Sequence, residues 1–145
     1  MDFISKIIHA LTVTHPLHPM LVHFPIALTG AAALFILIAA WRKNSVLEIA
    51  AFANIALAFF GTLAAAYTGI RSNIENYDGV APNAMIKISL ASILILITGI
   101  TVYSRWRNPK LIESPARPIY ITAYLISFVI VLILAFLGGV ILYGY

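Results

Sequence analysis

The chain contains no cysteine, and only 10% of its 145 residues are charged. The absence of cysteine excludes disulfides, thiolate metal sites, iron–sulfur ligation and covalent attachment of c-type haem. The scarcity of charge excludes an ordinary soluble domain, in which about a quarter of the residues are charged. Because 62% of the residues are hydrophobic, we predict a membrane protein.

Four segments are long and apolar enough to span a bilayer, which requires about 20 mostly apolar residues. They cover about 19–41, 46–70, 84–103 and 119–142. We therefore predict an all-α membrane protein with a single domain over 1–145, in which four transmembrane helices form an antiparallel bundle. Apolar residues at helical spacing over about 2–13 predict a short amphipathic interfacial helix before the first span. A frayed tail is the alternative for this segment.

Basic residues are distributed unevenly among the three connections between spans. The first and third connections contain six of them, and the second contains Arg71 alone. Because basic loops stay in the cytoplasm, we expect both termini and the connection over 71–83 to face the outer side. The formal charge of +4 follows from this topology signal, and no nucleic-acid partner is expected.

Small residues indicate where the spans pack against each other, because lipid provides no hydrophobic force for helix association. Gly61, Ala65 and Gly69 recur at four-residue spacing in the second span and predict a smooth face for a neighbouring helix. No acidic residue lies deep in a span, and Glu48 belongs to the start of the second one. This pattern argues against ion transport, which normally needs buried carboxylates or broken helices.

The first span begins with the motif His-Pro-Met-Leu-Val-His-Phe-Pro-Ile-Ala-Leu, from His18 to Leu28. Residues that precede proline avoid the α region, so His18 is predicted to be extended, with Pro19 at the first helical position. The motif places His23 one turn inside the apolar segment. Its two imidazoles either bind a cofactor, or cap the helix and bond to a neighbouring helix or lipid head group.

The predicted topology brings five candidate cofactor-binding residues to the outer end of the bundle: His18, His23, Arg71, Asn83 and Lys87. Asn83 and Lys87 are one helical turn apart and share a face. The second and fourth spans end nearby with Thr68, Gly69, Gly138, Gly139, Tyr143 and Tyr145. Such a polar cluster suits haem b with its propionates toward water, a quinone head group, a bound lipid or another subunit.

A haem b between helices needs one or two axial imidazoles. All four histidines precede residue 24, so a second ligand would come from His9, His15, His18 or a methionine such as Met85. This makes a bis-histidine site within one chain geometrically poor. His15, His18 and His23 are also candidate ligands for zinc or copper, but no carboxylate accompanies them and no metal site is predicted.

These residues resemble the domain-of-unknown-function family 2231, a family of small bacterial membrane proteins whose hallmark is the same histidine–proline motif. Thr68-Gly69 and Leu137-Gly138-Gly139 with Tyr143 match later features, and the resemblance covers roughly 18–145. It implies four spans in the bacterial cytoplasmic membrane, and relatives beside cytochrome domains imply electron-transfer membranes. The family often has a histidine early in the third span, followed by a polar residue four positions on. Asn83 and Lys87 occupy the equivalent place here, which removes the partner expected for His23.

The expected function is that of an accessory subunit in a larger respiratory or photosynthetic electron-transfer complex, with a structural or assembly role. Its partners would be membrane lipids and other integral membrane subunits. The alternative is a haem b-binding or quinone-contacting electron-transfer subunit that uses His23. No catalytic triad, nucleotide loop or thiol nucleophile is visible, so an enzyme is not expected.

Overall fold

The computed structural model describes residues 3–5 and 17–143, and in these ranges the chain is almost entirely helical, with no strand. The long helices are α2 (Leu17–Arg42), α3 (Ser45–Tyr77), α4 (Ala84–Arg107) and α5 (Arg117–Tyr143), and a short 3-10 helix, η2 (Leu111–Glu113), precedes α5. Of the interfacial helix predicted over about 2–13, only 3–5 are described, and they are helical with Phe3 exposed. The other residues of that prediction lie outside the described ranges.

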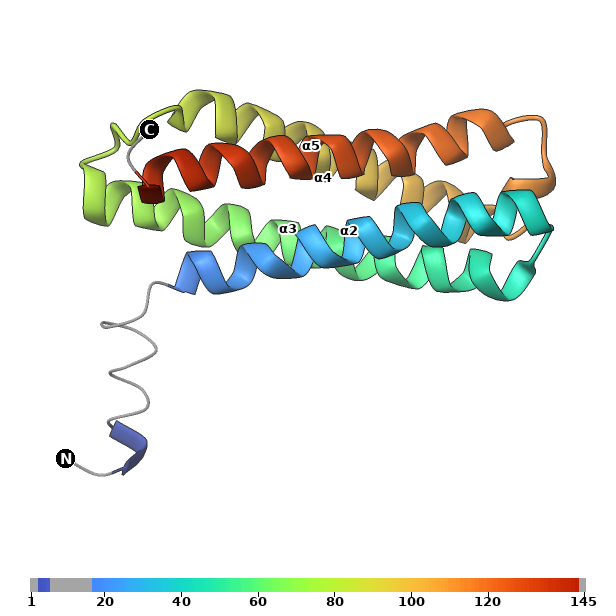
Figure 1. The fold of residues 1–145 in the computed structure, drawn as a ribbon, viewed down its shortest axis with the longest axis horizontal. Coiled ribbons are helices and arrows are strands. Elements are labelled where there is room, and N and C mark those ends of the chain that lie inside the picture. Colours follow the sequence, from blue (N-terminus) through green and yellow to red (C-terminus); the bar gives the residue numbers. More distant parts are fainter. Residues whose placement is uncertain (1–2, 6–16, 144–145) are drawn as a thin grey trace.

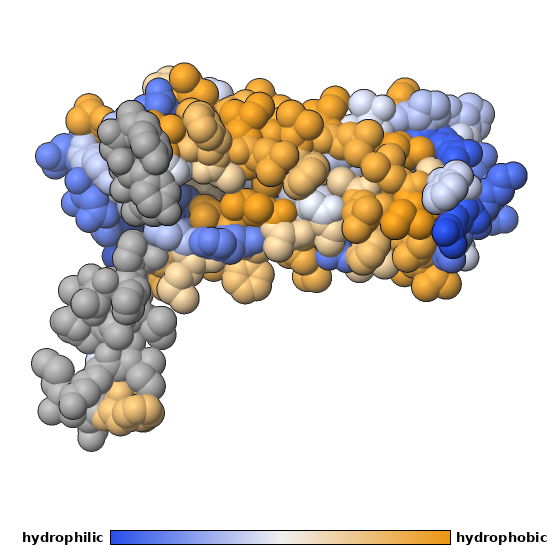
Figure 2. All heavy atoms as spheres, viewed as in Figure 1, coloured by the Kyte–Doolittle hydropathy of each residue, from blue (hydrophilic) through white to orange (hydrophobic). Residues whose placement is uncertain are grey.

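The four long helices form an antiparallel bundle in which each helix packs against two neighbours (Figure 1). Going round the bundle, α2 contacts α3, α3 contacts α4, α4 contacts α5, and α5 returns to α2. All four are long and apolar enough to cross a membrane, and apolar side chains cover the middle of the surface seen in Figure 2. The predicted four-span fold is confirmed.

The small-residue face of α3 packs against α2, as its spacing predicts. A Cβ added to Gly61 would lie 3.3 Å from Cδ of Pro25, and one added to Gly69 would lie 2.8 Å from Cε1 of His18. Ala65 is 7% exposed between them. The two helices therefore approach closely because α3 has almost no side chains along this line.

The helices extend beyond the predicted spans at several ends, and α4, for example, continues from the predicted 103 to Arg107. Helix α2 begins at Leu17, so the prediction of an extended His18 is wrong. The first four N–H groups of a helix have no partner within it, so Pro19 in the first turn sacrifices no hydrogen bond. Helix α3 continues beyond 70 to Tyr77, where Asp78 adopts the left-handed conformation and its N–H donates to the carbonyl of Asn73.

Candidate functional site

The two ends of the bundle hold different polar residues. We call the end at which α2 and α4 begin and α3 and α5 end the His18 end. We call the opposite end, where α2 and α4 finish, the Glu48 end. The five predicted cofactor-binding residues belong to the His18 end, and Figure 2 shows hydrophilic residues at both ends of the molecule.

The imidazole ring of His18, in α2, packs against α3. Its Nδ1 lies 3.3 Å from Oγ1 of Thr68. The Thr68 hydroxyl donates to the carbonyl of Ala64 at 3.0 Å, so its oxygen is free to accept the Nδ1–H of His18. Only a glycine at position 69 leaves room for the ring, because a Cβ there would be 2.8 Å from Cε1. The imidazole thus serves helix packing on the inside of the bundle.

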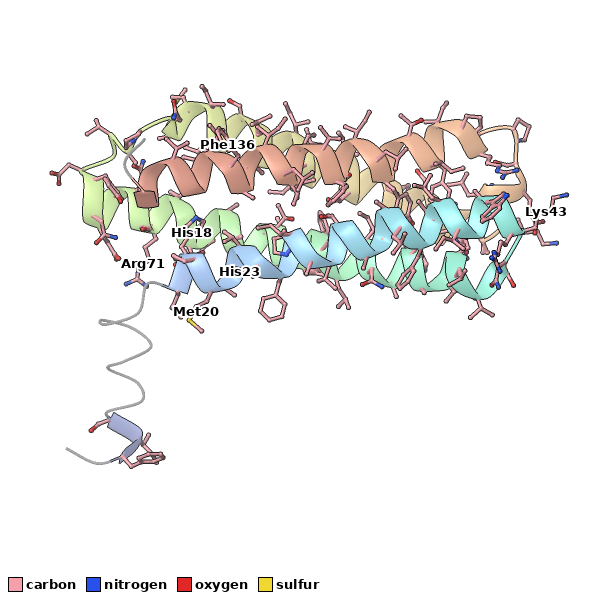
Figure 3. All side chains as sticks on the ribbon, viewed as in Figure 1. His18, Met20, His23, Lys43, Arg71 and Phe136 are labelled. Atoms are coloured by element: carbon pink, nitrogen blue, oxygen red, sulfur yellow. The ribbon has the colours of Figure 1, made fainter. Side chains whose placement is uncertain are left out.

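His23 faces outward from the same helix. It is exposed, and its Nδ1 lies 2.5 Å from the carbonyl oxygen of Pro19. A carbonyl only accepts, so Nδ1 carries the hydrogen of this bond. Five residues along a helix amount to a rotation of about 140°, which is why His18 and His23 point in different directions (Figure 3).

The other three predicted site residues are divided between surface and interior. Arg71 is exposed, and its Nε donates to Oε1 of Glu75 in the same helix at 2.6 Å. Asn83 is the exposed N-cap of α4, and its side chain makes no capping hydrogen bond. Lys87 is half-buried. The structure therefore leaves Arg71 and Asn83 on the surface, whereas His18 and Lys87 are less exposed.

The part of the chain that the structure describes contains no group of three or more histidine, cysteine or acidic side chains that could hold a metal ion. His9 and His15 lie outside that part. Met85, a candidate second haem ligand, is 78% exposed. A zinc or copper set built on both His18 and His23 would need two rings that point apart to converge.

The Glu48 end contains a buried network that the sequence analysis missed. Glu48 is 3% exposed, and its carboxylate accepts two hydrogen bonds from Arg105, at 2.5 Å from Nε and 2.7 Å from Nη2. The Tyr120 hydroxyl donates to the same carboxylate at 2.9 Å and accepts from the Tyr124 hydroxyl at 2.8 Å. The two hydrogen bonds from Arg105 to Glu48 make a bidentate pair, which is the strong form of an arginine–carboxylate interaction. It ties α3, α4 and α5 together.

A second contact at the Glu48 end joins α5 to α2. Nη2 of Arg117 in α5 donates to the carbonyl of Ala40 in α2 at 2.6 Å. A signal for the network was present in the sequence, because Glu48 lies three and seven residues before the buried Ala51 and Ile55. That spacing places Glu48 on the face of α3 that enters the core.

Two open apolar grooves lie on the sides of the bundle. The larger, of about 390 Å³, runs between α2 and α3 and is lined by Leu21, Phe24, Leu28, Leu57 and Gly61. The other, of about 300 Å³, lies between α4 and α5 and is lined by Ile97, Ile119, Thr122, Ala123 and Ile126. Both are lined almost entirely by apolar atoms, so they suit an acyl chain or an apolar side chain.

A family model described as "Predicted membrane protein (DUF2231)" matches residues 14–145. The comparison with curated proteins finds no match. The comparison with solved structures finds none either. The family match covers all four long helices and the histidine–proline motif.

Proposed function

Because the chain belongs to the DUF2231 family of predicted membrane proteins, we propose that it is a small accessory subunit of a larger respiratory or photosynthetic electron-transfer complex. Its role there is structural: it packs against other integral membrane subunits and supports their assembly. The observation that carries the proposal is the open groove between α2 and α3. The electron-transfer setting is taken from the family resemblance.

The groove lies at the depth of the bilayer. Gly61 is ten residues before Arg71, the first charged residue toward the end of α3, which corresponds to about 15 Å along the helix. Phe24 and Leu57 form its rim and are 61% and 59% exposed. Small residues in a membrane helix let a neighbouring helix approach closely. An occupant at this depth is itself embedded in the membrane, and a helix of a partner subunit meets that requirement.

The polar groups of the bundle support a structural role over transport. Glu48 is the buried carboxylate among the described residues, and Arg105 and Tyr120 neutralise and satisfy it. Helices α2 to α5 each continue without interruption. Transporters instead place unwound helices and ionisable groups along a pathway near the bilayer centre.

The test is to isolate the tagged protein from its native membranes in mild detergent and to identify what migrates with it. We expect a species much larger than 15.8 kDa that contains subunits with haem, iron–sulfur or pigment cofactors. Leu57→Trp fills the groove and should reduce the recovered partners several-fold. Leu96→Trp is the matched control, because Leu96 is 63% exposed on α4 and lines neither groove.

One result would reject the accessory role, namely that the wild-type protein migrates alone. If Leu57→Trp retained the same partners as Leu96→Trp, the groove would not be the contact surface, and the proposal would lose the observation that carries it.

The proposal includes an orientation in the bacterial cytoplasmic membrane, with both termini on the periplasmic side. It is supported by the six Lys and Arg residues in the connections at the Glu48 end, against Arg71 alone in the connection at the other end, because basic connections stay in the cytoplasm. The absence of cysteine allows single-cysteine labelling without background. An impermeant maleimide should label Val80→Cys in intact spheroplasts and Lys110→Cys only after lysis, and the opposite pattern would invert the topology.

A further inference from the structure

The groove between α4 and α5 begins at the Glu48 end and runs into the apolar middle of the bundle. It is lined by Ile97 in α4 and by a stripe of α5 that includes Ile119 and Ile126. Ile119 is the third residue of α5, so the groove starts about 3 Å from the beginning of that helix and continues inward for about 10 Å to Ile126. Because the helices follow each other around the bundle in the order α2, α3, α4, α5, this groove lies across the bundle from the one between α2 and α3.

Aromatic side chains at the Glu48 end indicate where the membrane interface lies. Trp106 is 71% exposed in the last turn of α4 and packs edge to face against Tyr103. Trp41 is 79% exposed, one residue before the end of α2. Tryptophan and tyrosine concentrate at the level of the lipid head groups. The groove therefore starts, at Ile119, close to the head-group layer, and its deeper part lies among the acyl chains.

Two basic side chains at this end of the groove have no acidic partner. Arg107 ends α4, and Lys110 follows in the connection to α5. Both are exposed, and neither side chain forms an ion pair within the ranges 3–5 and 17–143 that the structure describes. The Glu48 end as a whole contains six basic residues and two acidic ones, whereas the described residues of the other end contain two of each. This excess of positive charge favours an anionic ligand.

Two hydroxyl groups lie between these charges and the apolar part of the groove. Thr122 lines the groove in α5, and Ser104 follows Ile97 by two helical turns on the same face of α4. The other five threonines of the long helices each donate to a carbonyl four residues earlier. The hydroxyls of Thr122 and Ser104 make no such bond within the described part of the chain, so both can donate to an acceptor from outside.

We propose that the groove between α4 and α5, with the polar residues at its Glu48 end, binds one anionic phospholipid. The groups along the site follow the same order as those of the lipid. Arg107 and Lys110 bind the phosphate, the hydroxyls of Ser104 and Thr122 donate to the ester oxygens of the glycerol backbone, and an acyl chain fills the apolar groove. Ser104 is about 4 Å deeper than Arg107 along α4, which fits a head-group layer of about 5–8 Å.

Charge distinguishes this site from the groove between α2 and α3. The exposed arginine nearest to that groove along α3, Arg71, is already paired with Glu75 and lies about 15 Å from Gly61 along the helix. Basic residues beside a groove between membrane helices are the usual means of binding an anionic head group. A zwitterionic phospholipid carries a cation of its own, so unpaired Arg107 and Lys110 prefer a head group with a net negative charge.

The first experiment titrates the purified full-length protein, in a neutral detergent, with dioleoyl phosphatidylglycerol or dioleoyl phosphatidylcholine and counts bound lipids by native mass spectrometry. We expect one phosphatidylglycerol per chain, bound about tenfold more tightly than phosphatidylcholine. Arg107→Gln/Lys110→Gln should remove this preference. Arg42→Gln/Lys43→Gln is the matched control and should retain it, because these residues are exposed at the same end (Figure 3) but line neither groove.

A second pair of variants tests the groove without any change of charge. Thr122→Trp fills the groove and should weaken phosphatidylglycerol binding several-fold. Leu132→Trp is the control, because Leu132 is 48% exposed on α5 and lines neither groove. Both substitutions are at exposed positions, and circular dichroism checks that the helical content is unchanged.

Three outcomes would overturn the proposal. They are equal binding of the two lipids, an equal loss of preference in the two double glutamine variants, or unchanged phosphatidylglycerol binding in Thr122→Trp. The lipid site does not rest on the accessory role, which is tested at the opposite groove by Leu57→Trp. A protein that migrates alone but selects phosphatidylglycerol would reject only the accessory role, and one that enters a larger complex without this selectivity would reject only the lipid site.

Discussion

The Glu48 end and the His18 end join the same four helices by different physical means. At the Glu48 end, Glu48, Arg105, Tyr120 and Tyr124 connect α3, α4 and α5 through charged and hydroxyl groups. At the His18 end, within the described residues, the side chains of His18 and Thr68 form a 3.3 Å contact between α2 and α3. The comparison shows that polar side chains select which helices pair at the Glu48 end. At the His18 end, the pairing of α2 with α3 depends on the close approach of their backbones.

The difference follows from burial. Side-chain exposure is 12% for Arg105 and 4% for Glu48, against 63% and 52% for Arg71 and Glu75 at the other end. A buried ion pair is costly to break from one side, because the remaining charge has no water to solvate it. An exposed pair within one helix is screened by solvent and contributes little. The same kind of arginine–glutamate pair is therefore important for stability at the Glu48 end and contributes little at the His18 end.

The largest effect should come from breaking the pair at the Glu48 end. Arg105→Met leaves the Glu48 carboxylate buried with only the Tyr120 hydroxyl, and we expect a loss of about 3–5 kcal/mol in the free energy of unfolding. The measurement is reversible unfolding in bicelles. The control adds Glu48→Leu to Arg105→Met, which removes both charges and should restore most of the loss. Equal loss in the single and double variants would contradict the weight given to the buried charge.

An intermediate effect is expected from glycines at the His18 end. Gly69→Ala places a Cβ 2.8 Å from the His18 ring, and the resulting shift of α2 against α3 should cost about 1–3 kcal/mol. Gly138→Ala is the matched control, because nothing lies within 4 Å of its added Cβ. There the better helix propensity of alanine should stabilise by up to about 1 kcal/mol. The same unfolding assay compares them, and equal changes would show that this end does not depend on close approach.

The smallest effect is expected from the exposed pair. Arg71→Ala removes the contact with Glu75 in the same helix, and solvent screening should make the change in unfolding undetectable. Unfolding curves at low and high salt check this, since a weak surface pair responds to ionic strength. A loss close to that of Arg105→Met would make the two ends equivalent and would remove the contrast between them.

The sequence predicted the fold well because the deciding signals are local. Long apolar segments locate α2 to α5, and four-residue spacing predicted that Gly61, Ala65 and Gly69 form a packing face. The predicted site was a group of residues at one depth, and depth follows from topology. Which of them face each other depends on helix rotation, which set His18 inward and His23 outward.

The network at the Glu48 end was missed because its members are far apart in the chain. Arg105 is 57 residues after Glu48, and Tyr120 is 72 residues after it. In the sequence, Arg105 is distinguished only as one of six basic residues that set the topology. Any of those six was a formal candidate partner for Glu48. Only the packed rotation of α3 against α4 and α5 selects one of them.

The Glu48 network also has a consequence for how the protein is made. Glu48 leaves the ribosome before Arg105, Tyr120 and Tyr124, so α2 and α3 enter the membrane when the carboxylate has none of its final partners. Its position in the first turn of α3 allows it to stay among the head groups during that interval. Arg105, Tyr120 and Tyr124 all belong to α4 and α5, so the carboxylate gains its partners only when these two helices pack against α3.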